Sequence, residues 1–389
     1  MNTEKIKLFI QGRKGLLPKI EAACGKEKDI IWFHVASYGE FEEARPVIEA
    51  TRKRFPQRKI LLTVFSPTVY VPMQHYPVVD WVFYLPLDTP WNVRRFLNAV
   101  RPVKAVFTLT DFWPVLLNAL RRRKIDTYIM SLHLEAGSKH LKRKDFLFRQ
   151  IIRKCYKCVM VQDKETYRLL SPLGIPQMKV TGDPRMDRVV AVTDEPWNDS
   201  ILDEWSRGEK VFVAGSTYEP ENRMMLEIAN AHPESRFLIV PHEIEDAQVN
   251  ALLEGSLHGA TRYTDYHPGA QILVVDTVGM LSRLYRYGYA AYVGGAFTEG
   301  APHSVVEPAS YGIPVAFGPQ YRRDAHCRDF VAMGVGVSVS SREELEAFYQ
   351  KTEKDTRFRE EFGHLAADYC RSRSGATQEI MKEIFGPED

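Results

Sequence analysis

Apolar residues in the first half of the chain fall in short, nearly continuous runs separated by amphipathic stretches. The stretches 91–100 and 112–123 are examples of the second kind. Continuous apolar strands that alternate with helices are typical of a parallel sheet covered on both faces. The predicted strands are 30–35, 59–64, 81–85, 105–109, 127–130 and 158–161.

The same pattern resumes after a polar stretch at 191–208, which contains Pro196 and is the predicted linker. Further strands are predicted at 211–214, 237–240, 272–275, 290–293 and 314–317. The last helical stretch, 377–385, has no following strand and is expected to pack back on the first domain. The fold class is therefore α/β, with doubly wound domains at 1–190 and 209–375 facing a central cleft, and a C-terminal helix within 376–389. Ligands are expected at the carboxyl ends of the strands.

Composition agrees with this organisation, because 389 residues with 44% hydrophobic and 26% charged residues suit two globular domains. No apolar run approaches the roughly 18–20 residues that cross a bilayer, and the N-terminus does not resemble a secretory signal. We therefore expect a cytoplasmic chain. The five cysteines are odd in number and scattered, which predicts reduced thiols, and the pair Cys155 and Cys158 lacks the second pair that a zinc site needs.

Charge is distributed unevenly although the net charge is only +2. Residues 1–190 carry 34 Lys and Arg against 18 Asp and Glu, and residues 191–389 carry 18 against 32. Residues 121–158 alone hold twelve basic and three acidic side chains. The first half thus suits an anionic partner, which could be nucleic acid, a phosphorylated lipid or an acidic membrane surface, or the basic residues form only a solvated face.

Two carboxylates follow predicted strands of the first domain. Glu40 lies at the start of a helix after strand 30–35, where the helix dipole would help to keep it ionised as a base. Asp111 has the matching place after strand 105–109 and opens a helix that has Pro114 in its first turn. Each could instead be an ordinary capping residue, but carboxylates at the carboxyl ends of one sheet could also share a cleft.

The second domain contains a candidate anion site. Val293, Gly294 and Gly295 end a strand, and the segment from His303 to Gly312 is predicted to be a helix. A glycine turn before a helix start can present free N–H groups to an anion. Glu307 lies one turn into this helix, where it could accept hydrogen bonds from ribose hydroxyls. A structural Gly-Gly turn is the alternative.

A series of motifs in a fixed order resembles one family, the 3-deoxy-D-manno-octulosonic acid (Kdo) transferases of lipopolysaccharide synthesis, particularly those of Bacteroidetes type. The series spans about residues 30 to 330. Its members are Trp32–Pro46 (WFHVASYGEFEEARP), Phe65–Pro67 (FSP), Tyr84–Pro90 (YLPLDTP), Phe112–Pro114 (FWP), Gly182–Asp187 (GDPRMD), Ala214–Thr217 (AGST), Pro241–Ile244 (PHEI), Gly279–Leu281 (GML), Val293–Gly295 (VGG) and Phe317–Pro319 (FGP).

The resemblance implies the GT-B architecture of two Rossmann-like domains, and it implies site residues. Glu40 corresponds to the catalytic base, while Asp111 and Arg185 correspond to residues that support the transition state. The residues that contact CMP would be Pro241, His242, Val278, Gly279, Met280, Ser304, Val305, Val306 and Glu307. The chain departs from the family in three places. Asp111 stands for a Glu, Ser304 stands for an Asn, and the hydrophobic N-terminal anchor has no counterpart.

The predicted reaction is an inverting transfer of Kdo from CMP-Kdo to a hydroxyl of the lipid A precursor (lipid IVA). The expected partners are these two substrates and the anionic surface of the inner membrane. The protein would be peripheral on the cytoplasmic face of that membrane. Nucleic acid is not expected as a partner. No Asp-x-Asp pair occurs in the sequence, so neither a metal ion nor another cofactor is expected. The alternatives are another GT-B-like nucleotide-sugar enzyme, such as a UDP-sugar transferase or an epimerase, and a non-catalytic family member.

Overall fold

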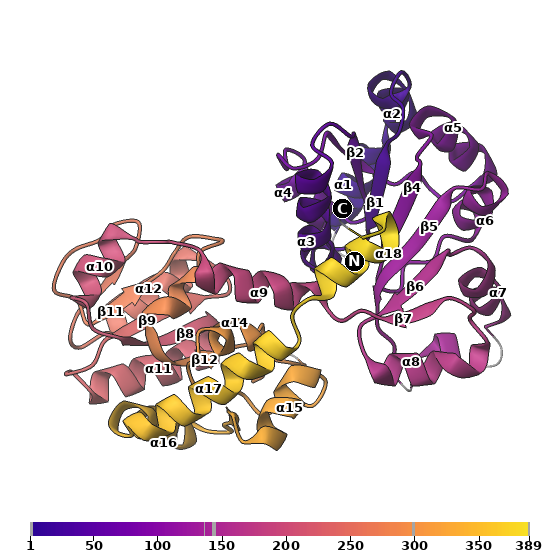
Figure 1. Ribbon diagram of the computed structural model, residues 1–389. Coiled ribbons are helices and arrows are strands. Elements are labelled where there is room, and N and C mark those ends of the chain that lie inside the picture. The colour runs from indigo at the N-terminus through magenta and orange to yellow at the C-terminus, as the bar shows by residue number, and fades with distance from the viewer. Residues whose placement is uncertain (1–2, 136, 142–144, 298–299, 388–389) are drawn as a thin grey trace. The chain divides into compact units, whose positions relative to one another are not determined.

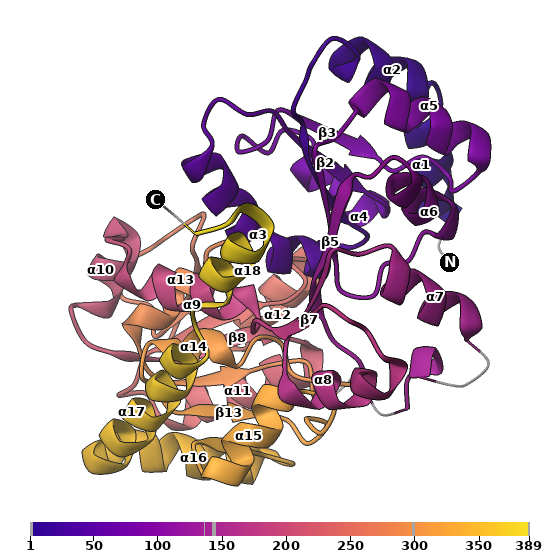
Figure 2. The same ribbon diagram turned by 45° about the vertical axis from the view of Figure 1, so that its right-hand side comes forward.

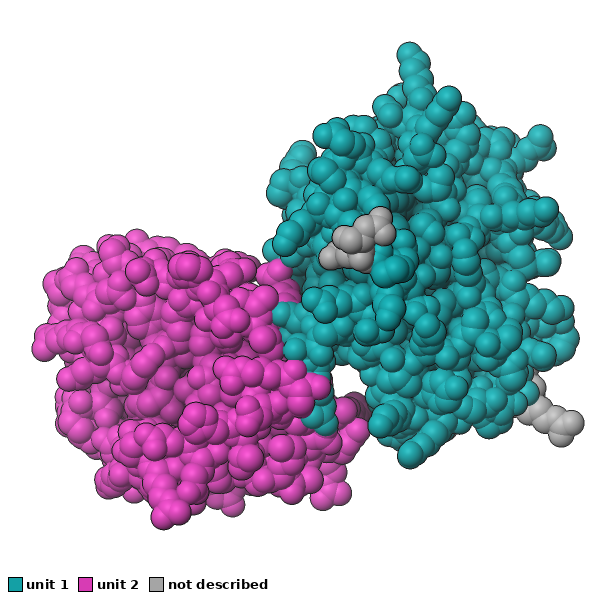
Figure 3. Space-filling view, in the orientation of Figure 1, with its two compact units in different colours: residues 1–187, 373–389 teal, residues 188–372 magenta. Residues whose placement is uncertain are grey.

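The computed structural model describes residues 3–135, 137–141, 145–297 and 300–387. The chain divides into two compact units, shown in different colours in Figure 3. Unit 1 comprises residues 1–187 and 373–389, and unit 2 comprises residues 188–372.

Within the described residues, unit 1 is built on a seven-stranded parallel sheet of order β3-β2-β1-β4-β5-β6-β7 (Figure 1). The order reverses between β1 and β4, which places the topological switch point there. The strands are β1 (Ile31–Val35), β2 (Ile60–Val64), β3 (Trp81–Tyr84), β4 (Lys104–Thr108), β5 (Asp126–Leu132), β6 (Cys158–Val161) and β7 (Met178–Val180).

Helices cover both faces of this sheet, and α18 from the end of the chain lies against α3 (Figures 1 and 2). The Thr51 hydroxyl of α3 donates to the Met381 sulfur of α18, and the Phe55 ring lies 4.9 Å from that of Phe385. The helices are α1 (Thr3–Arg13), α2 (Leu16–Cys24), α3 (Tyr38–Arg54), α4 (Pro67–Met73), α5 (Pro90–Val100), α6 (Pro114–Arg122), α7 (Phe146–Lys154), α8 (Lys164–Leu170) and α18 (Ala376–Phe385). Helix α9 (Pro184–Asp194) crosses into unit 2.

Unit 2 repeats the design, with a described sheet of seven parallel strands in the order β10-β11-β9-β8-β12-β13-β14 and a switch point between β8 and β12. The strands are β8 (Val211–Thr217), β9 (Phe237–Pro241), β10 (Ala260–Arg262), β11 (Ile272–Val274), β12 (Gly288–Val293), β13 (Val315–Phe317) and β14 (Gly336–Ser338). The helices are α10 (Ser200–Ser206), α11 (Glu219–Ala231), α12 (Asp246–Gly255), α13 (Leu281–Leu284), α14 (Val306–Ser310), α15 (Ala325–Met333), α16 (Arg342–Lys354) and α17 (Thr356–Ser372).

The strands predicted from apolar runs are all present, because their side chains are the buried ones. Every residue of β1, β2, β6 and β9 is buried. Strands β7, β10 and β14, which have only three residues each, were not predicted. All three are terminal strands of their sheets, and β7 has two exposed residues, so its sequence carries little apolar signal.

The predicted linker at 191–208 is wrong. Residues 191–194 complete α9, and residues 200–206 form α10, whose N-cap Asp199 accepts from the Ile201 and Leu202 N–H groups. Leu202 and Trp205 are buried in the core of unit 2. The sequence of this segment is polar because α10 buries only one face of the helix. The boundaries between the units fall after residues 187 and 372 instead.

All five cysteines lie in the described part of the chain and are buried, and none of them forms a disulfide there. Cys155 and Cys158 are each 6% exposed, so they are core thiols at the entrance to β6. Among the described helices, none has both the length and the apolar character needed to cross a bilayer.

Candidate functional site

The two carboxylates predicted from sequence come from the two strands that flank the switch point of unit 1. Glu40 follows β1 and Asp111 follows β4, and these strands pair directly in parallel. The carboxyl ends of adjacent parallel strands meet at one edge of the sheet, which is where doubly wound folds bind ligands. The fold therefore places Glu40 and Asp111 in one site.

Glu40 occupies the first turn of α3, and its environment differs from the one predicted. One carboxylate oxygen accepts a hydrogen bond from the Ala36 N–H at 2.5 Å, and the Ser37 hydroxyl caps the Glu40 N–H at 3.3 Å. Burial raises the pKa of Glu40 to about 7, the Ala36 N–H opposes the shift, and the charge of Asp111 adds to it. Desolvation therefore opposes the predicted effect of the helix start and favours the protonated form of Glu40.

Asp111 is held by a buried histidine that the sequence analysis did not single out. His34 in β1 is 0% exposed, and its Nε2 lies 2.6 Å from an Asp111 carboxylate oxygen. Its Nδ1 lies 3.0 Å from the Thr63 carbonyl oxygen and 2.8 Å from the Thr63 hydroxyl. The imidazole thus fixes Asp111 beside Glu40, although the side chain of Asp111 is one methylene shorter than that of the expected Glu. A polar residue inside an apolar strand was the available signal.

The capping interpretation of Asp111 is also wrong. Helix α6 begins at Pro114 with Trp113 as its N-cap, and its first amides are satisfied by another residue. The carboxylate of Asp88 accepts hydrogen bonds from the N–H groups of Val115 at 3.0 Å and Leu116 at 2.8 Å. Asp88 therefore caps α6, and the Asp111 carboxylate lies in the candidate site without a capping role.

Arg185, the third predicted residue, lies in the first turn of α9 and belongs to unit 1. Its guanidinium donates to both carboxylate oxygens of Asp183, at 2.9 and 3.1 Å from Nε and 2.6 Å from Nη2. It also lies 3.5 Å from the carboxylate of Glu43, which is one helical turn after Glu40 in α3. Its side chain is 44% exposed, so part of it faces solvent.

In unit 2, the predicted His242 comes together with His303, which was not predicted as a site residue, at the carboxyl ends of β9 and β12. Their rings are stacked with centroids 4.3 Å apart, and the ring of Tyr218, which follows β8, lies 4.8 Å from that of His242. The Tyr218 hydroxyl is 3.2 Å from Nε2 of His303. Burial and the nearby His242 lower the pKa of His303 to about 4, so this ring is neutral near pH 7.

The turn at Gly294 and Gly295 does not present open N–H groups as predicted. The Gly294 N–H donates to the carbonyl oxygen of Gly215, and the Gly295 N–H donates to the buried carboxylate of Glu221. Glu221 also accepts from the Tyr292 hydroxyl at 2.9 Å and the Tyr218 N–H at 2.8 Å. The turn is therefore a structural one built around Glu221, which the sequence analysis missed because it reads as a helix-start carboxylate.

The other predicted CMP residues follow the strands of the same edge. Pro241 ends β9, and Val278, Gly279 and Met280 lie between β11 and α13. Ser304 and Val305 precede α14, which begins at Val306 rather than at His303 and has five residues, Glu307 among them. Val278 is 91% exposed and Ser304 is exposed, so both are accessible to a ligand.

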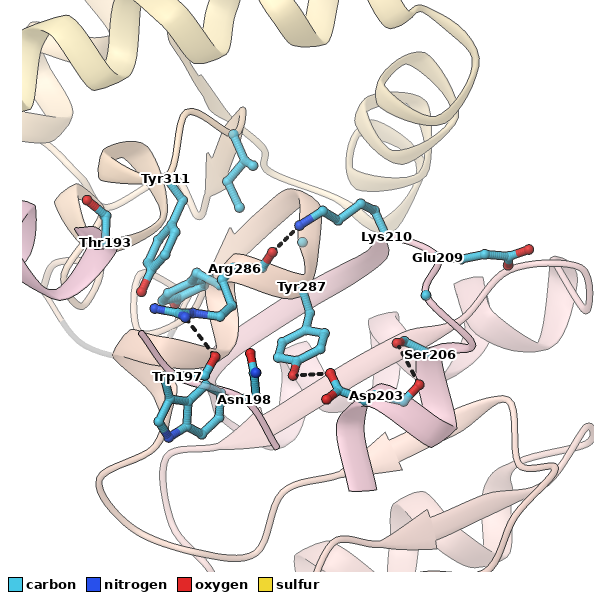
Figure 4. A pocket seen from close by; sticks show the side chains of 14 residues that line it. Thr193, Trp197, Asn198, Asp203, Ser206, Glu209, Lys210, Arg286, Tyr287 and Tyr311 are labelled. Carbon is cyan, nitrogen blue, oxygen red and sulfur yellow. Dashed lines mark hydrogen bonds between the residues drawn. The ribbon is translucent and has the colours of Figure 1, made fainter. Parts of the chain in front are cut away.

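A surface pocket of about 720 Å³ lies elsewhere in unit 2 (Figure 4). Lys210 and Tyr287 line it beside the amino-terminal ends of β8 and β12. The Tyr287 hydroxyl donates to Asp203 at 2.6 Å, and Arg286 donates to the Trp197 carbonyl oxygen at 2.8 Å. None of the predicted CMP residues lines this pocket, so we do not assign the donor to it. In the described ranges, no group of three or more His, Cys, Asp or Glu side chains is arranged to hold a metal ion.

Comparison with known sequences agrees with the motif order. The family model described as 3-Deoxy-D-manno-octulosonic-acid transferase (kdotransferase) matches residues 10–188. The 3-deoxy-D-manno-octulosonic acid transferase of Haemophilus influenzae is 28% identical over 367 residues, which cover 90% of this chain and 85% of that protein. The chain is thus similar in sequence to the Kdo transferases over most of its length, and residues 10–188 match their family model. The Aquifex aeolicus member of this family is 26% identical over 332 residues, covering 82% of this chain and 84% of that protein.

Solved structures show that the fold is GT-B. The UDP-GlcNAc 2-epimerase of Neisseria meningitidis superposes with a TM-score of 0.62 at 12% identity, covering 92% of this chain and 99% of that one. MurG of Acinetobacter baumannii superposes with a TM-score of 0.58 at 13% identity, with the same coverage. At such identities the likeness establishes the architecture alone, and the similarity to Kdo transferases rests on sequence.

Proposed function

We propose that the chain is a member of the Kdo transferase family and transfers Kdo from CMP-Kdo to a hydroxyl of the lipid A precursor lipid IVA. The observation that carries the proposal is the placement of Glu40 and Asp111 at the β1/β4 switch point, with a Glu40 pKa near 7. A general base works best when its pKa lies near the working pH. Glu40 is the group that meets this condition and also begins a helix at the ligand-binding edge.

The proposed reaction is a single displacement. Glu40 accepts the proton of the acceptor hydroxyl as that oxygen forms a bond to the anomeric carbon of Kdo. The bond from the anomeric carbon to the phosphate oxygen breaks at the same time, so CMP leaves with the electron pair and the configuration is inverted. An oxocarbenium-like transition state is expected, as in glycoside hydrolysis.

Asp111 and Arg185 complete this scheme with opposite charges. Asp111, fixed by His34, supports the positive charge that develops on the sugar ring. Arg185 meets the negative charge that develops on the leaving phosphate. Because Asp183 and Glu43 both contact Arg185, the guanidinium is held in a defined position before substrate arrives.

We place CMP on unit 2, at the carboxyl ends of β9, β11 and β12. The stacked rings of His242 and His303 offer an aromatic surface beside these strand ends. Glu307 in α14 would accept hydrogen bonds from the ribose, and Val278, Gly279 and Met280 would contact the nucleotide from the β11–α13 loop. This assignment rests on the motif resemblance and on the common edge that these residues share.

We further propose that the basic first unit lies against the anionic cytoplasmic face of the inner membrane, where the lipid acceptor resides. Arg121, Arg122, Arg123 and Lys124, at the end of α6, are all exposed. Basic residues near such a surface contribute about 1 kcal/mol each to binding. The basic run at 142–144 lies outside the described residues.

The deciding experiment is incubation of the protein with CMP-Kdo and tetra-acyl lipid A precursor, with mass analysis of the lipid. We expect the lipid to gain the mass of Kdo, and we expect the reaction to continue in excess EDTA because Arg185 supplies the positive charge. An unchanged lipid, together with consumption of a UDP-sugar in a parallel incubation, would favour the other class of nucleotide-sugar enzyme. Loss of activity in EDTA that magnesium restores would contradict the metal-free scheme.

A further inference from the structure

Glu43 is a buried carboxyl group in unit 1 to which the proposed reaction gives no chemical step. It lies one turn after Glu40 in α3, and its side chain is 4% exposed. The Gln162 side-chain amide, at the end of β6, donates to one of its oxygens at 3.1 Å. The other oxygen lies 3.5 Å from Nη2 of Arg185. A buried carboxyl group in contact with a proposed catalytic cation affects that cation through its charge.

The charges around Arg185 show what the proton on Glu43 changes. Arg185 already forms a two-oxygen ion pair with Asp183, and this pair has no net charge. If Glu43 carries a proton, the group of three remains neutral. If Glu43 is ionised, the group has a net negative charge, and a second carboxylate attracts the same guanidinium. An oxyanion of the substrate would then meet repulsion where it should meet Arg185.

The surroundings of Glu43 favour the protonated form at neutral pH. Burial raises the pKa of Glu43 to about 8, with Asp183 and Glu40 acting in the same direction and Arg185 and Gln162 opposing it. The other elements that pack on α3 add little charge. Helix α4 has no charged residue, Glu383 of α18 pairs with Lys179, and Lys104 of β4 pairs with Asp126. His34 of β1 is in contact with Asp111.

We propose that Glu43 is a positioning residue whose proton determines whether Arg185 is available to an oxyanion of the substrate. This inference rests on the proposed function, because it takes Arg185 as the group that meets the leaving phosphate. Protonated Glu43 holds the guanidinium in place without competing for its charge. Ionised Glu43 draws the guanidinium into an ion pair within unit 1, and transfer slows.

The proposal predicts a bell-shaped dependence of the transfer rate on pH. The rate rises as Glu40 loses its proton near pH 7 and falls as Glu43 loses its proton near pH 8. In Glu43→Gln the amide imitates the protonated carboxyl group, so the alkaline fall should disappear while the acid limb stays. The rate of each protein is first divided by its own rate at pH 7. One pH unit above the pKa of Glu43, this relative rate should be about tenfold higher for Glu43→Gln than for the parent.

The matched control is Glu42→Gln, which removes the neighbouring carboxylate of the same helix. Glu42 lies 3.6 Å from Arg45 and has no part in the proposed reaction, so this variant should keep both limbs. Thermal unfolding of each protein verifies the fold. An alkaline limb that is absent from the parent, or that persists unchanged in Glu43→Gln, would overturn the proposal.

Gln162→Met provides a second test that does not alter the carboxyl group. The amide of Gln162 stabilises ionised Glu43, so its removal should raise the pKa of Glu43 and shift the alkaline limb to higher pH. A limb that stays in place or moves to lower pH contradicts the proposal, even if Glu43→Gln fails to fold. Failure of the proposed function looks different, because the parent would transfer no Kdo or Glu40→Gln would be as active as the parent.

Discussion

Burial determines the chemistry of Glu40 more than its position at a helix start does. The helix dipole favours a carboxylate by about 0.3–1 kcal/mol, whereas each unit of pKa shift corresponds to about 1.4 kcal/mol. The balance between burial and the interactions that favour the ionised form places the pKa of Glu40 near 7. Near this pH the carboxyl group can release its proton to solvent and can then accept one from a substrate hydroxyl. A solvent-exposed glutamate would be ionised throughout the neutral range and would be a weaker base.

Glu40→Gln is expected to lower turnover at least about a hundredfold, the usual effect of losing a general base, while CMP binding stays close to that of the parent. In the parent, the rate should rise with pH through about 7, because the active form of Glu40 is the ionised one. Rate measurements between acid and neutral pH test both points. Near-normal turnover in Glu40→Gln would remove this residue from the mechanism.

The contact between His34 and Asp111 predicts a strong energetic coupling. A buried polar group that loses its partner is left without compensation, which destabilises proteins by about 1–3 kcal/mol. A double-mutant cycle of His34→Leu and Asp111→Asn, measured by chemical denaturation, should give a coupling of about 1–3 kcal/mol.

The exposed pair His133 and Asp163 is the control for this cycle, with the same chemistry at 2.9 Å and side chains that are 42% and 39% exposed. The same two substitutions there should give a coupling of less than about 1 kcal/mol. Equal couplings at the two places would mean that burial of His34 contributes nothing to holding Asp111.

At the scale of elements, the short helix α14 differs most from its prediction. It begins three residues later than expected, and the glycine turn before it is satisfied by Glu221. Gly295 has a φ of 108°, and a Cβ there would lie 2.9 Å from the Ala301 carbonyl oxygen, so the turn requires glycine for its own geometry. The proposed recognition of CMP in this region would therefore depend on side chains, with Glu307 as the principal candidate.

Glu307→Ala should weaken CMP binding by roughly 10- to 150-fold, because a hydrogen bond to a charged group contributes about 1.5–3 kcal/mol. Ser304→Asn, which restores the residue expected from the family resemblance, should bind CMP at least as well as the parent. Calorimetry with CMP on the three proteins makes the comparison. Undiminished binding by Glu307→Ala would move the nucleotide away from α14.

At the scale of the whole molecule, the uneven charge predicts attraction to anionic surfaces. The protein should bind anionic vesicles more tightly than neutral ones, and binding should weaken as salt rises, since exposed charges are screened beyond about 8–10 Å. Arg122→Glu with Arg123→Glu should lower vesicle binding at least about tenfold in a sedimentation assay, with little change in thermal stability.

The control reverses two exposed basic residues of unit 2, Arg223→Glu and Arg357→Glu, which are 66% and 86% exposed. This pair changes the net charge equally but lies in the acidic half of the chain. We expect its vesicle binding to stay close to that of the parent. Equal losses in the two double variants would make total charge, not the basic unit, the cause of binding.

The fold class, most of the strands and the resemblance to the Kdo transferases follow from the amino-acid pattern alone. Buried parallel strands need apolar residues along their whole length, so β1, β2 and β9 are visible as runs, and the ordered motifs carry the resemblance. The pattern also placed Glu40 and Asp111, because a residue that follows a buried strand must lie at the ligand-binding edge. Three-residue strands at exposed edges carry no comparable signal, and β7 and β14 were missed for that reason.

The pairing and protonation of these side chains depend on the folded molecule. His34 and Asp111 are 77 positions apart, and Glu43 meets Arg185 from another element, so neither contact follows from spacing along the chain. The pKa of Glu40 depends on how much water surrounds it, which is a property of the packed molecule. The linker assignment failed for the same reason, since the burial of Leu202 and Trp205 is decided by the partners they meet after folding.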